Sequence, residues 1–254
     1  MKKNMGFVMR FTILFSGVLL ALTACADDPV DKQNEETAKL ESQPVTQEVI
    51  KDKEVTKKPV VNLLEKFQEG VHYFAINPPV PVDDPNKIEV AEMFWYGCSH
   101  CFAFEPVLNK WKPTLAADVN FVRVPAMWNP IMEAHARLFY TAKKLGVLED
   151  SHQAIFNEIH INGKRLDKTE DIALLLEKFG ANRKEVINDL NSFDITSEVK
   201  KADLRARSYK IGGVPNVVVE GKYRIETNEN VKQDNMLEVV DFLIKKSRVA
   251  KKLR

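Results

Sequence analysis

The spacing of hydrophobic and polar positions changes several times along this chain of 254 residues, and each spacing predicts a different element. Short apolar runs rich in Val and aromatic residues, bounded by turn residues, predict strands, whereas apolar residues that recur every three or four positions predict amphipathic helices. We expect strands at residues 71–76, 88–96, 119–124, 216–220 and 222–225, the last two joined by a hairpin turn at Glu220-Gly221. We expect helices at residues 98–115 (kinked at Pro106), 131–145, 149–160, 169–179, 183–191, 197–209 and 236–251.

The order of these elements predicts an α/β fold. Two strands, a helix and a further strand come first, five helices follow, and two strands and a helix close the chain. This order indicates a small mixed sheet interrupted by a helical insertion. The boundaries that it predicts are residues 61–126 and 197–254 for the domain that holds the sheet, and 127–196 for the insertion.

The N-terminus carries the pattern of a secretory signal peptide. Lys2, Lys3 and Arg10 precede or border a mostly apolar run at residues 11–21, which is too short to span a bilayer as a mature helix. Lysine and arginine (37 residues) nearly balance aspartate and glutamate (36), which gives a formal net charge of +1. Loss of the three basic residues with the signal changes +1 to −2, and a nearly neutral chain argues against nucleic acid as a partner.

The predicted signal ends in Leu22-Thr23-Ala24-Cys25, which resembles the lipobox of bacterial lipoproteins. The resemblance implies that residues 1–24 are a lipoprotein signal peptide, that Cys25 is acylated, and that the lipid holds the exported protein on the inner or the outer membrane. An ordinary signal peptide with a chance cysteine near its cleavage site is the alternative.

Residues 25–60 differ in composition from the rest of the chain. From Asp27 to Lys58 the sequence is rich in charged residues, lacks aromatic residues and has no sustained apolar period, which is typical of a disordered tether. Because residues 47–64 could form part of a helix, a segment that dimerises remains the alternative.

Two of the three cysteines form a Cys-x-x-Cys pair, Cys98-Ser99-His100-Cys101, directly after an apolar strand. A strand that turns into a helix places Cys98 at the helix N-terminus, where the macrodipole and free backbone N–H groups favour a thiolate. The thiolate is the form that attacks disulfides. The pattern therefore predicts thiol–disulfide exchange, with Cys98 as the nucleophile and Cys101, one turn into the helix, as its more buried partner. Two core thiols without a redox role are the alternative.

The histidines do not complete a metal site around these cysteines. A zinc site needs two more cysteine or histidine ligands at metal spacing, and His100 is the only histidine beside the motif. We therefore expect no metal and no cofactor other than the Cys98–Cys101 disulfide. His152 and His160 lie eight residues apart in one expected helix and are interpreted as ordinary helix or surface residues.

Several features together resemble the DsbA family of periplasmic thiol:disulfide oxidoreductases, within the thioredoxin superfamily. They are the segment Cys98-Ser99-His100-Cys101-Phe102-Ala103-Phe104-Glu105, Pro106 five residues after Cys101, the segment Gly213-Val214-Pro215-Asn216, and the order of the elements. The resemblance implies a thioredoxin fold with a helical insertion domain. It also implies an enzyme that donates its disulfide to exported proteins during oxidative folding.

The resemblance also assigns roles to single residues. It implies that Pro215 is a cis-proline and that the backbone of Val214 binds substrate. It implies that Glu92 is a buried acid for proton transfer, with Arg123 where the family has a lysine; a solvated face for Glu92 is the alternative. His100 is expected to stabilise the Cys98 thiolate. Ser99 stands where the family commonly has proline, which leaves the oxidising strength open.

The expected partners follow from the same resemblance. They are unfolded or reduced exported proteins, a DsbB-like quinone-linked oxidase in the membrane that renews the disulfide, and the membrane itself through the lipid anchor in the bacterial periplasm. Two other functions remain as alternatives. One is a disulfide isomerase or reductase, although Val214 argues against it because such members more often have threonine there. The other is a Cu(I)-binding protein of the thioredoxin superfamily, although the chain has no Met- or His-rich cluster.

Overall fold

A computed structural model of the chain describes residues 66–252. The predicted signal peptide, the lipidation site Cys25 and the predicted tether therefore lie outside the described residues. Within the described part of the chain, no helix is both long enough and apolar enough to span a bilayer.

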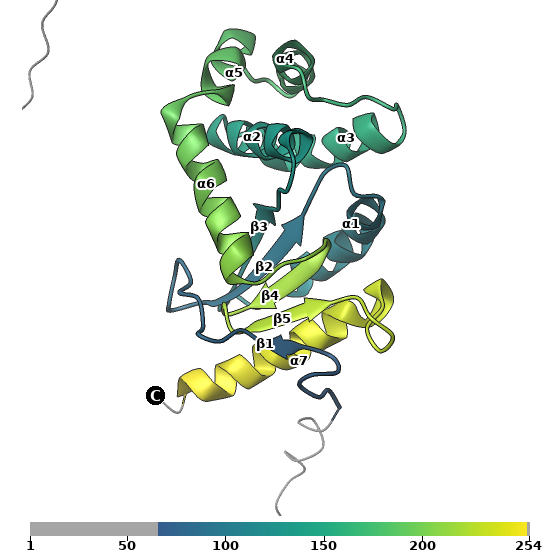
Figure 1. Cartoon of the computed structure of the whole chain (residues 1–254), viewed down its shortest axis with the longest axis vertical. Coiled ribbons are helices and arrows are strands. Elements are labelled where there is room, and N and C mark those ends of the chain that lie inside the picture. The colour runs from purple at the N-terminus through teal and green to yellow at the C-terminus, as the bar shows by residue number, and fades with distance from the viewer. Residues whose placement is uncertain (1–65, 253–254) are drawn as a thin grey trace, which may run out of the picture. The chain divides into compact units, whose positions relative to one another are not determined.

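A five-stranded mixed sheet forms the centre of the described structure, with strand order β1-β5-β4-β2-β3 (Figure 1). The central strand β2 pairs in parallel with β3 and antiparallel with β4, and the pairs β4–β5 and β5–β1 are antiparallel. The strands are β1 (Phe74–Ala75), β2 (Ile88–Phe94), β3 (Val119–Pro125), β4 (Asn216–Val219) and β5 (Tyr223–Glu226).

Helices surround this sheet in the order that the sequence predicts. The helices α2 to α5 gather at one end of the sheet, α6 runs from that end back along the sheet, and α7 packs against β2, β4 and β5 (Figure 1). The helices are α1 (Ser99–Trp111), the 3₁₀ helix η2 (Lys112–Thr114), α2 (Pro130–Lys144), α3 (Leu148–His160), α4 (Thr169–Glu177), α5 (Arg183–Leu190), α6 (Phe193–Ser208) and α7 (Gln233–Lys252). The order is that of a thioredoxin fold with a helical insertion between β3 and β4.

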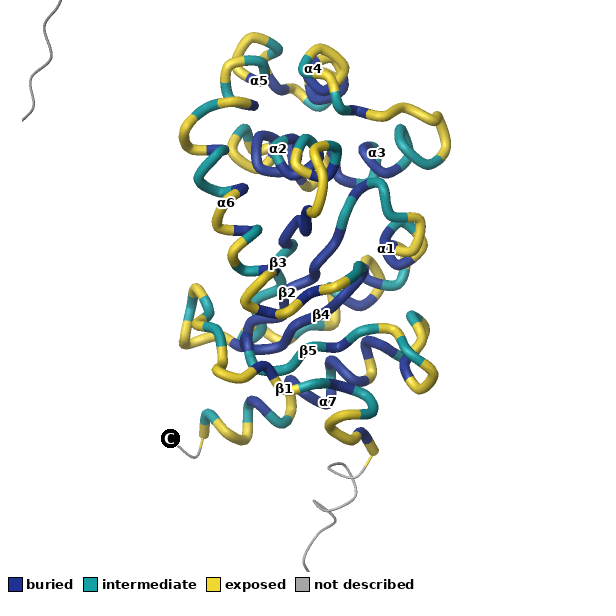
Figure 2. Tube along the Cα trace, in the orientation of Figure 1, coloured by how far each residue is buried: buried dark blue, intermediate teal, exposed yellow. Residues whose placement is uncertain are grey.

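The strand β2 is buried along its whole length (Figure 2). From residue 88 to residue 93 its apolar side chains alternate between two cores. Ile88 and Val90 belong to the core that α1 and α7 complete, whereas Ala91 and Met93 belong to the core shared with the insertion and α6. Because successive side chains of a strand point to opposite faces, Glu92 lies on the same face as Ile88 and Val90, beneath α1.

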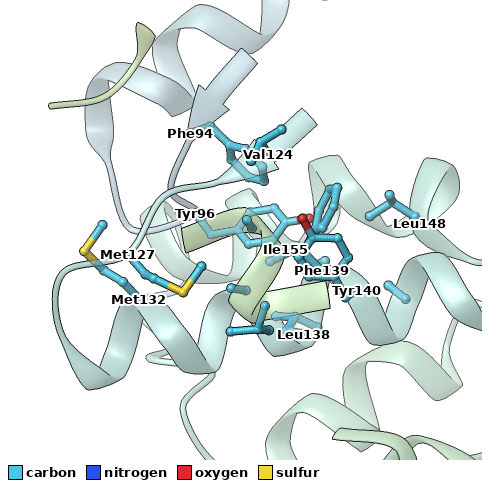
Figure 3. Close-up of a cluster of buried hydrophobic side chains, with 14 of the residues drawn as sticks. Phe94, Tyr96, Val124, Met127, Met132, Leu138, Phe139, Tyr140, Leu148 and Ile155 are labelled. Atoms are coloured by element: carbon cyan, nitrogen blue, oxygen red, sulfur yellow. The ribbon is translucent and has the colours of Figure 1, made fainter. Parts of the chain in front are cut away.

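The second core joins the end of the sheet to the insertion. Figure 3 shows Phe94, at the end of β2, and Tyr96, just after it, grouped with Phe139 of α2 and Ile155 of α3. All four side chains are at most 2% exposed. The insertion therefore packs directly against the segment that leads from β2 to the cysteines.

Most observed element boundaries differ from the predicted ones by a few residues, and three of the differences affect the site or the insertion. The first strand is limited to Phe74–Ala75, and β2 ends at Phe94, two residues early. The helix predicted from residue 197 begins at Phe193, because the hydroxyl of Ser192 caps it by accepting a hydrogen bond from the backbone N–H of Ile195. The predicted end of the insertion, residue 196, therefore falls inside α6.

Candidate redox site

Cys98 is the N-cap residue of α1, which places its sulfur at the free N–H groups of the first helical turn. The backbone N–H of Cys101 donates a hydrogen bond to the Cys98 sulfur over 3.3 Å. Both cysteines are free thiols in this structure; Cys98 is partly exposed, and Cys101 is fully buried. The Cys98 sulfur is thus the one that another protein can reach.

The two thiols differ strongly in acidity. The hydrogen bond between the Cys98 and Cys101 side chains, the backbone N–H groups of Cys101 and His100, and the charge of His100 lower the pKa of Cys98 to about 6, although burial opposes them. Burial, followed by the proximity of Cys98 and the charge of Glu92, raises the pKa of Cys101 far above its usual range. At neutral pH the pair therefore carries a single negative charge, on the exposed sulfur.

His100 and Ser99 occupy the exposed first turn of α1. The carbonyl of His100 accepts a hydrogen bond of 2.6 Å from the side chain of Gln233, at the start of α7. The charge of His100 is the smallest of the stated influences on Cys98. The structure therefore gives the helix backbone and Cys101 the larger share in stabilising the thiolate.

The loop before β4 lies beside the cysteines. The Val214–Pro215 peptide bond is cis, and the carbonyl of Val214 accepts a hydrogen bond of 3.4 Å from the Cys98 thiol. A pocket of about 630 Å³ adjoins this loop, lined by His100, Val214, Pro215, Thr227, Asn228, Glu229, Lys232, Gln233 and Asp234.

Glu92 and Arg123 meet beneath the motif. They are direct partners in the parallel register of β2 and β3, so their side chains leave the same face of the sheet. The Nε–H of Arg123 donates to Glu92 over 3.2 Å, and Glu92 is fully buried, which excludes the solvated alternative. Burial first, and then the negative charge of Glu105, raise the pKa of Glu92 to about 8, while Arg123 acts in the opposite direction.

The structure adds three residues to which the sequence assigned no role. Glu105 of α1 accepts a hydrogen bond of 3.0 Å from the Nη2–H of Arg123, and its other oxygen lies 3.2 Å from Nε2 of His152. The Nδ1 atom of His152 lies 2.7 Å from the hydroxyl of Tyr96. His152 lies in the expected helix, but it is buried, so the surface part of its interpretation was wrong. The sequence shows an acid, Glu105, in the helix after the cysteines and a histidine, His152, in a later helix. Only the contact between them in the structure indicates a shared role.

Within residues 66–252, no group of three or more Cys, His, Asp or Glu side chains has the arrangement of a metal site. The described site contains an acidic thiol, Cys98, and a buried carboxyl group, Glu92.

Comparison with known proteins gives a consistent result. The family model of the DSBA-like thioredoxin domain matches residues 115–241, a range that begins after the cysteine motif and includes Arg123, Val214 and Pro215. Over 188 residues the chain is 40% identical to the thiol:disulfide interchange protein DsbA of Pseudomonas aeruginosa, which covers 74% of this chain and 89% of that relative. Over 181 residues it is 41% identical to the same-named protein of Azotobacter vinelandii, covering 71% of this chain and 85% of that relative.

Solved structures resemble this one over the same part of the chain. The crystal structure of Pseudomonas aeruginosa DsbA superimposes with a TM-score of 0.70 at 41% identity, covering 73% of this chain and 97% of that one. The structure of the oxidoreductase DsbA from Xylella fastidiosa superimposes with a TM-score of 0.67 at 28% identity, covering 70% of this chain and 96% of that one.

Proposed function

The chain belongs to the DsbA family of thiol:disulfide oxidoreductases, and from this membership we propose how its own residues donate a disulfide to proteins during oxidative folding. The disulfide is formed by Cys98 and Cys101. The observation that carries this proposal is the Cys98 sulfur at the N-cap of α1, 3.3 Å from the N–H of Cys101, with its pKa lowered to about 6.

The reaction runs in two exchange steps. A substrate thiolate attacks the Cys98 sulfur, a bond forms between substrate and Cys98, and Cys101 leaves as a thiolate that takes up a proton. A second substrate thiolate then attacks the substrate sulfur of this mixed disulfide, and Cys98 leaves as a thiolate. The substrate has lost two electrons, which the enzyme holds as the reduced cysteine pair. The low pKa of Cys98 favours the second step because it makes Cys98 a good leaving group.

The substrate backbone binds at the cis-proline loop. The carbonyl of Val214 lies 3.4 Å from the Cys98 sulfur, so a peptide whose cysteine reaches Cys98 passes beside Val214 and Pro215. An extended peptide pairs there with the exposed backbone in the manner of an added strand. The adjoining pocket of about 630 Å³ holds side chains that flank the substrate cysteine.

Glu92 is the proton donor and acceptor for Cys101, and Arg123 positions it. Support comes from the complete burial of Glu92, its pKa of about 8, and the effect of its charge on Cys101. A carboxyl group with that pKa is mostly protonated at neutral pH and has a proton to give when Cys101 leaves as a thiolate.

The surroundings of the enzyme follow from the signal pattern and from the family. The protein acts in the bacterial periplasm on reduced or unfolded exported proteins, anchored to the inner or outer membrane by lipid on Cys25. A DsbB-like quinone-linked oxidase in the membrane restores the Cys98–Cys101 disulfide.

Trapping of the mixed disulfide tests the roles of the two cysteines. In Cys101→Ser the Cys98 thiolate can attack a peptide that contains a disulfide and displace one of its sulfurs as a thiolate. The Cys101 thiol that would resolve the mixed disulfide is missing, so adducts should accumulate on Cys98 and be visible by mass spectrometry. In Cys98→Ser both adducts and exchange activity should be absent. Adducts that accumulate on Cys101 instead would show that the roles are reversed. The equilibrium potential against glutathione, expected to be strongly oxidising, tests the direction of the reaction.

A further inference from the structure

His152 belongs to the insertion, yet it contacts the charged residues under the redox site. Its ring lies in an aromatic cage, with centroid distances of 5.5 Å to Phe94, 5.1 Å to Tyr96 and 5.3 Å to Phe156. Both ring nitrogens have a polar neighbour: Nε2 lies 3.2 Å from Glu105, and Nδ1 lies 2.7 Å from the Tyr96 hydroxyl. The cage excludes water, so these two neighbours decide where the ring carries its proton.

The state of Glu105 determines the tautomer of His152. Glu105 accepts a hydrogen bond from Arg123 and its pKa is lowered, so it is an ionised carboxylate, which only accepts hydrogen bonds; Nε2 therefore carries the hydrogen that faces Glu105. Burial lowers the pKa of His152, which keeps the ring neutral. In a neutral ring Nδ1 then accepts, and the Tyr96 hydroxyl donates to it. The result is a continuous chain of donors from Tyr96 through His152 to Glu105.

Two carboxyl groups share one guanidinium in this network. Arg123 donates from Nη2 to Glu105 over 3.0 Å and from Nε to Glu92 over 3.2 Å. Glu105 receives a second donor from His152. Glu92 receives none: its Oε1 atom is buried and has no hydrogen-bond partner within the described residues. The single positive charge of Arg123 compensates one negative charge. Ionisation costs less free energy at Glu105, which has two hydrogen-bond donors, than at Glu92, which has one.

We propose that His152, by donating a hydrogen bond to Glu105, makes Glu105 the permanent anion of this network and leaves the exchangeable proton on Glu92. His152 is thus a positioning residue: it touches neither substrate nor sulfur, but it decides which of two carboxyl groups serves Cys101. This inference rests on the proposed role of Glu92 as the proton donor to Cys101. It links the insertion to the chemistry of the thioredoxin domain through named contacts.

The acidities of the two carboxyl groups agree with this assignment. The hydrogen bond and charge of His152, with Arg123, lower the pKa of Glu105 against the effect of burial. Burial and the charge of Glu105 raise the pKa of Glu92 to about 8. The unpartnered Oε1 of Glu92 is where its proton resides, because Oε2 faces Arg123. When substrate attacks Cys98, this proton passes to the Cys101 sulfur and Glu92 becomes an anion; reoxidation of the pair returns it.

The titrating and charged groups of this network come from five segments of the chain. Besides Glu105, Arg123 of β3 and His152 of α3, they are Cys101 of α1, Lys112 of η2, Tyr96 after β2, and Glu149 of α3. Every group except His152 remains in place in the variant described next, so a change there reports the loss of the His152 donor.

Substitution of His152 by phenylalanine tests the proposal. His152→Phe keeps an aromatic ring in the cage but removes the donor to Glu105. In the reduced variant, the pKa of Glu105 should rise by about one to two units, and that of Glu92 should fall by about one unit because Arg123 then pairs more strongly with it. Carbon-13 NMR titration of labelled glutamate carboxyl groups measures both values directly. At pH 8, mixed-disulfide formation should slow about five-fold, as the protonated fraction of Glu92 falls.

Two further variants control for a structural effect. The amide of His152→Gln can donate to Glu105 and accept from Tyr96, so it should restore both titrations to those of the parent. His135→Phe removes another buried histidine, which contacts Trp95 and the backbone of Arg165 but neither carboxyl group. It should leave both titrations unchanged even if it lowers the stability. Unchanged Glu92 and Glu105 titrations in folded His152→Phe would overturn the proposal.

A measurement on the unaltered protein keeps the test valid if His152→Phe does not fold. Nitrogen-15 NMR of the His152 ring should show a neutral ring with hydrogen on Nε2 through the pH range in which Cys98 titrates. A charged ring, or hydrogen on Nδ1, would overturn the inference. The activity of Glu92→Gln tests the role of Glu92 separately from the effect of His152. If this variant forms mixed disulfides as fast as the parent at every pH, Glu92 is not the proton donor to Cys101. The effect of His152 on the charges of Glu105 and Glu92 is tested independently by the NMR titrations.

Discussion

The acidity of one sulfur atom results from several contacts of unequal size. Cys98 is held as a thiolate chiefly by its hydrogen bond with Cys101 and by backbone N–H groups of the first turn of α1, with a smaller contribution from the charge of His100. The helix start therefore accounts for most of the effect, and the residues between the two cysteines adjust it.

The variant His100→Pro measures that adjustment. Proline is tolerated in the first turn of a helix, but it removes the His100 N–H and the imidazole, both of which lower the pKa of Cys98. We expect that pKa to rise by about one unit and the redox potential to fall by about 30 mV, because less stable thiolate means a less stable reduced form. Thiolate absorbance against pH and equilibration with glutathione measure the two quantities. A lower potential with an unchanged Cys98 pKa would contradict this explanation.

At the scale of elements, the turn between β4 and β5 is joined to the segment before β2. Glu220 and Gly221 both have positive φ, at 57° and 60°, as the hairpin turn predicted at this position requires. The backbone N–H of Val80 donates to the carbonyl of Gly221 over 3.0 Å. A Cβ atom on Gly221 would lie 2.0 Å from the carbonyl oxygen of Val80, which is backbone and has little freedom to move.

Gly221→Ala should therefore destabilise the protein by about 2–5 kcal/mol, the sum of a left-handed backbone and a steric clash. Gly163→Ala is the matched control, because Gly163 has a φ of 67° and nothing lies within 4 Å of an added Cβ. It should cost only about 1–2 kcal/mol. Urea unfolding of both variants gives the two values. Equal losses would show that the contact with Val80 contributes nothing.

At the scale of the whole molecule, the redox state and the pH together set the stability. The pKa of Cys98 is about 6 in the folded, reduced protein, below the value of about 8.5 for an unfolded cysteine. The thiolate therefore stabilises the folded reduced form fully above the unfolded value, and this contribution is lost as the pH falls through about 6. The oxidised protein has no such thiolate.

The free energy of unfolding of the reduced protein should therefore rise, relative to that of the oxidised protein, as the pH increases from about 6 to about 8.5. Below this window the difference between the two forms should be constant. Urea unfolding of both forms at a series of pH values measures it. A difference that does not vary across the window would mean that the Cys98 thiolate gains nothing from the fold.

The predicted lipid anchor also belongs to the whole molecule. Because Leu22-Thr23-Ala24-Cys25 resembles a lipobox, Cys25→Ala should block acylation and move the protein from the membrane fraction to the soluble fraction of cells. Immunoblots of separated fractions, with Cys98→Ser as a control that leaves the lipobox intact, measure this. A Cys25→Ala variant that stays with membranes as strongly as the parent would contradict the anchor.

The sequence alone determined the features of this protein that depend on neighbours along the chain. The Cys-x-x-Cys pair after an apolar strand predicted that Cys98 lies at a helix start. When a helix follows a strand directly, the residues between the two patterns must form the first turn of that helix. The apolar periods predicted the order of strands and helices, and an acid in a mostly apolar strand predicted the buried Glu92. Helix starts were less well predicted where a cap such as Ser192 extends the helix beyond its apolar period.

The tertiary structure decided what depends on contacts between distant segments. Arg123 meets Glu92 because β3 pairs with β2 in one particular register, and Val214 meets Cys98 because β4 lies antiparallel beside β2. The link from Glu105 to His152 crosses 47 residues and exists only because α3 packs against α1. Burial removes the water that would otherwise solvate these charged groups, so each group depends on its protein partners. Neither the position of His152 along the chain nor its residue type indicates which partner it has.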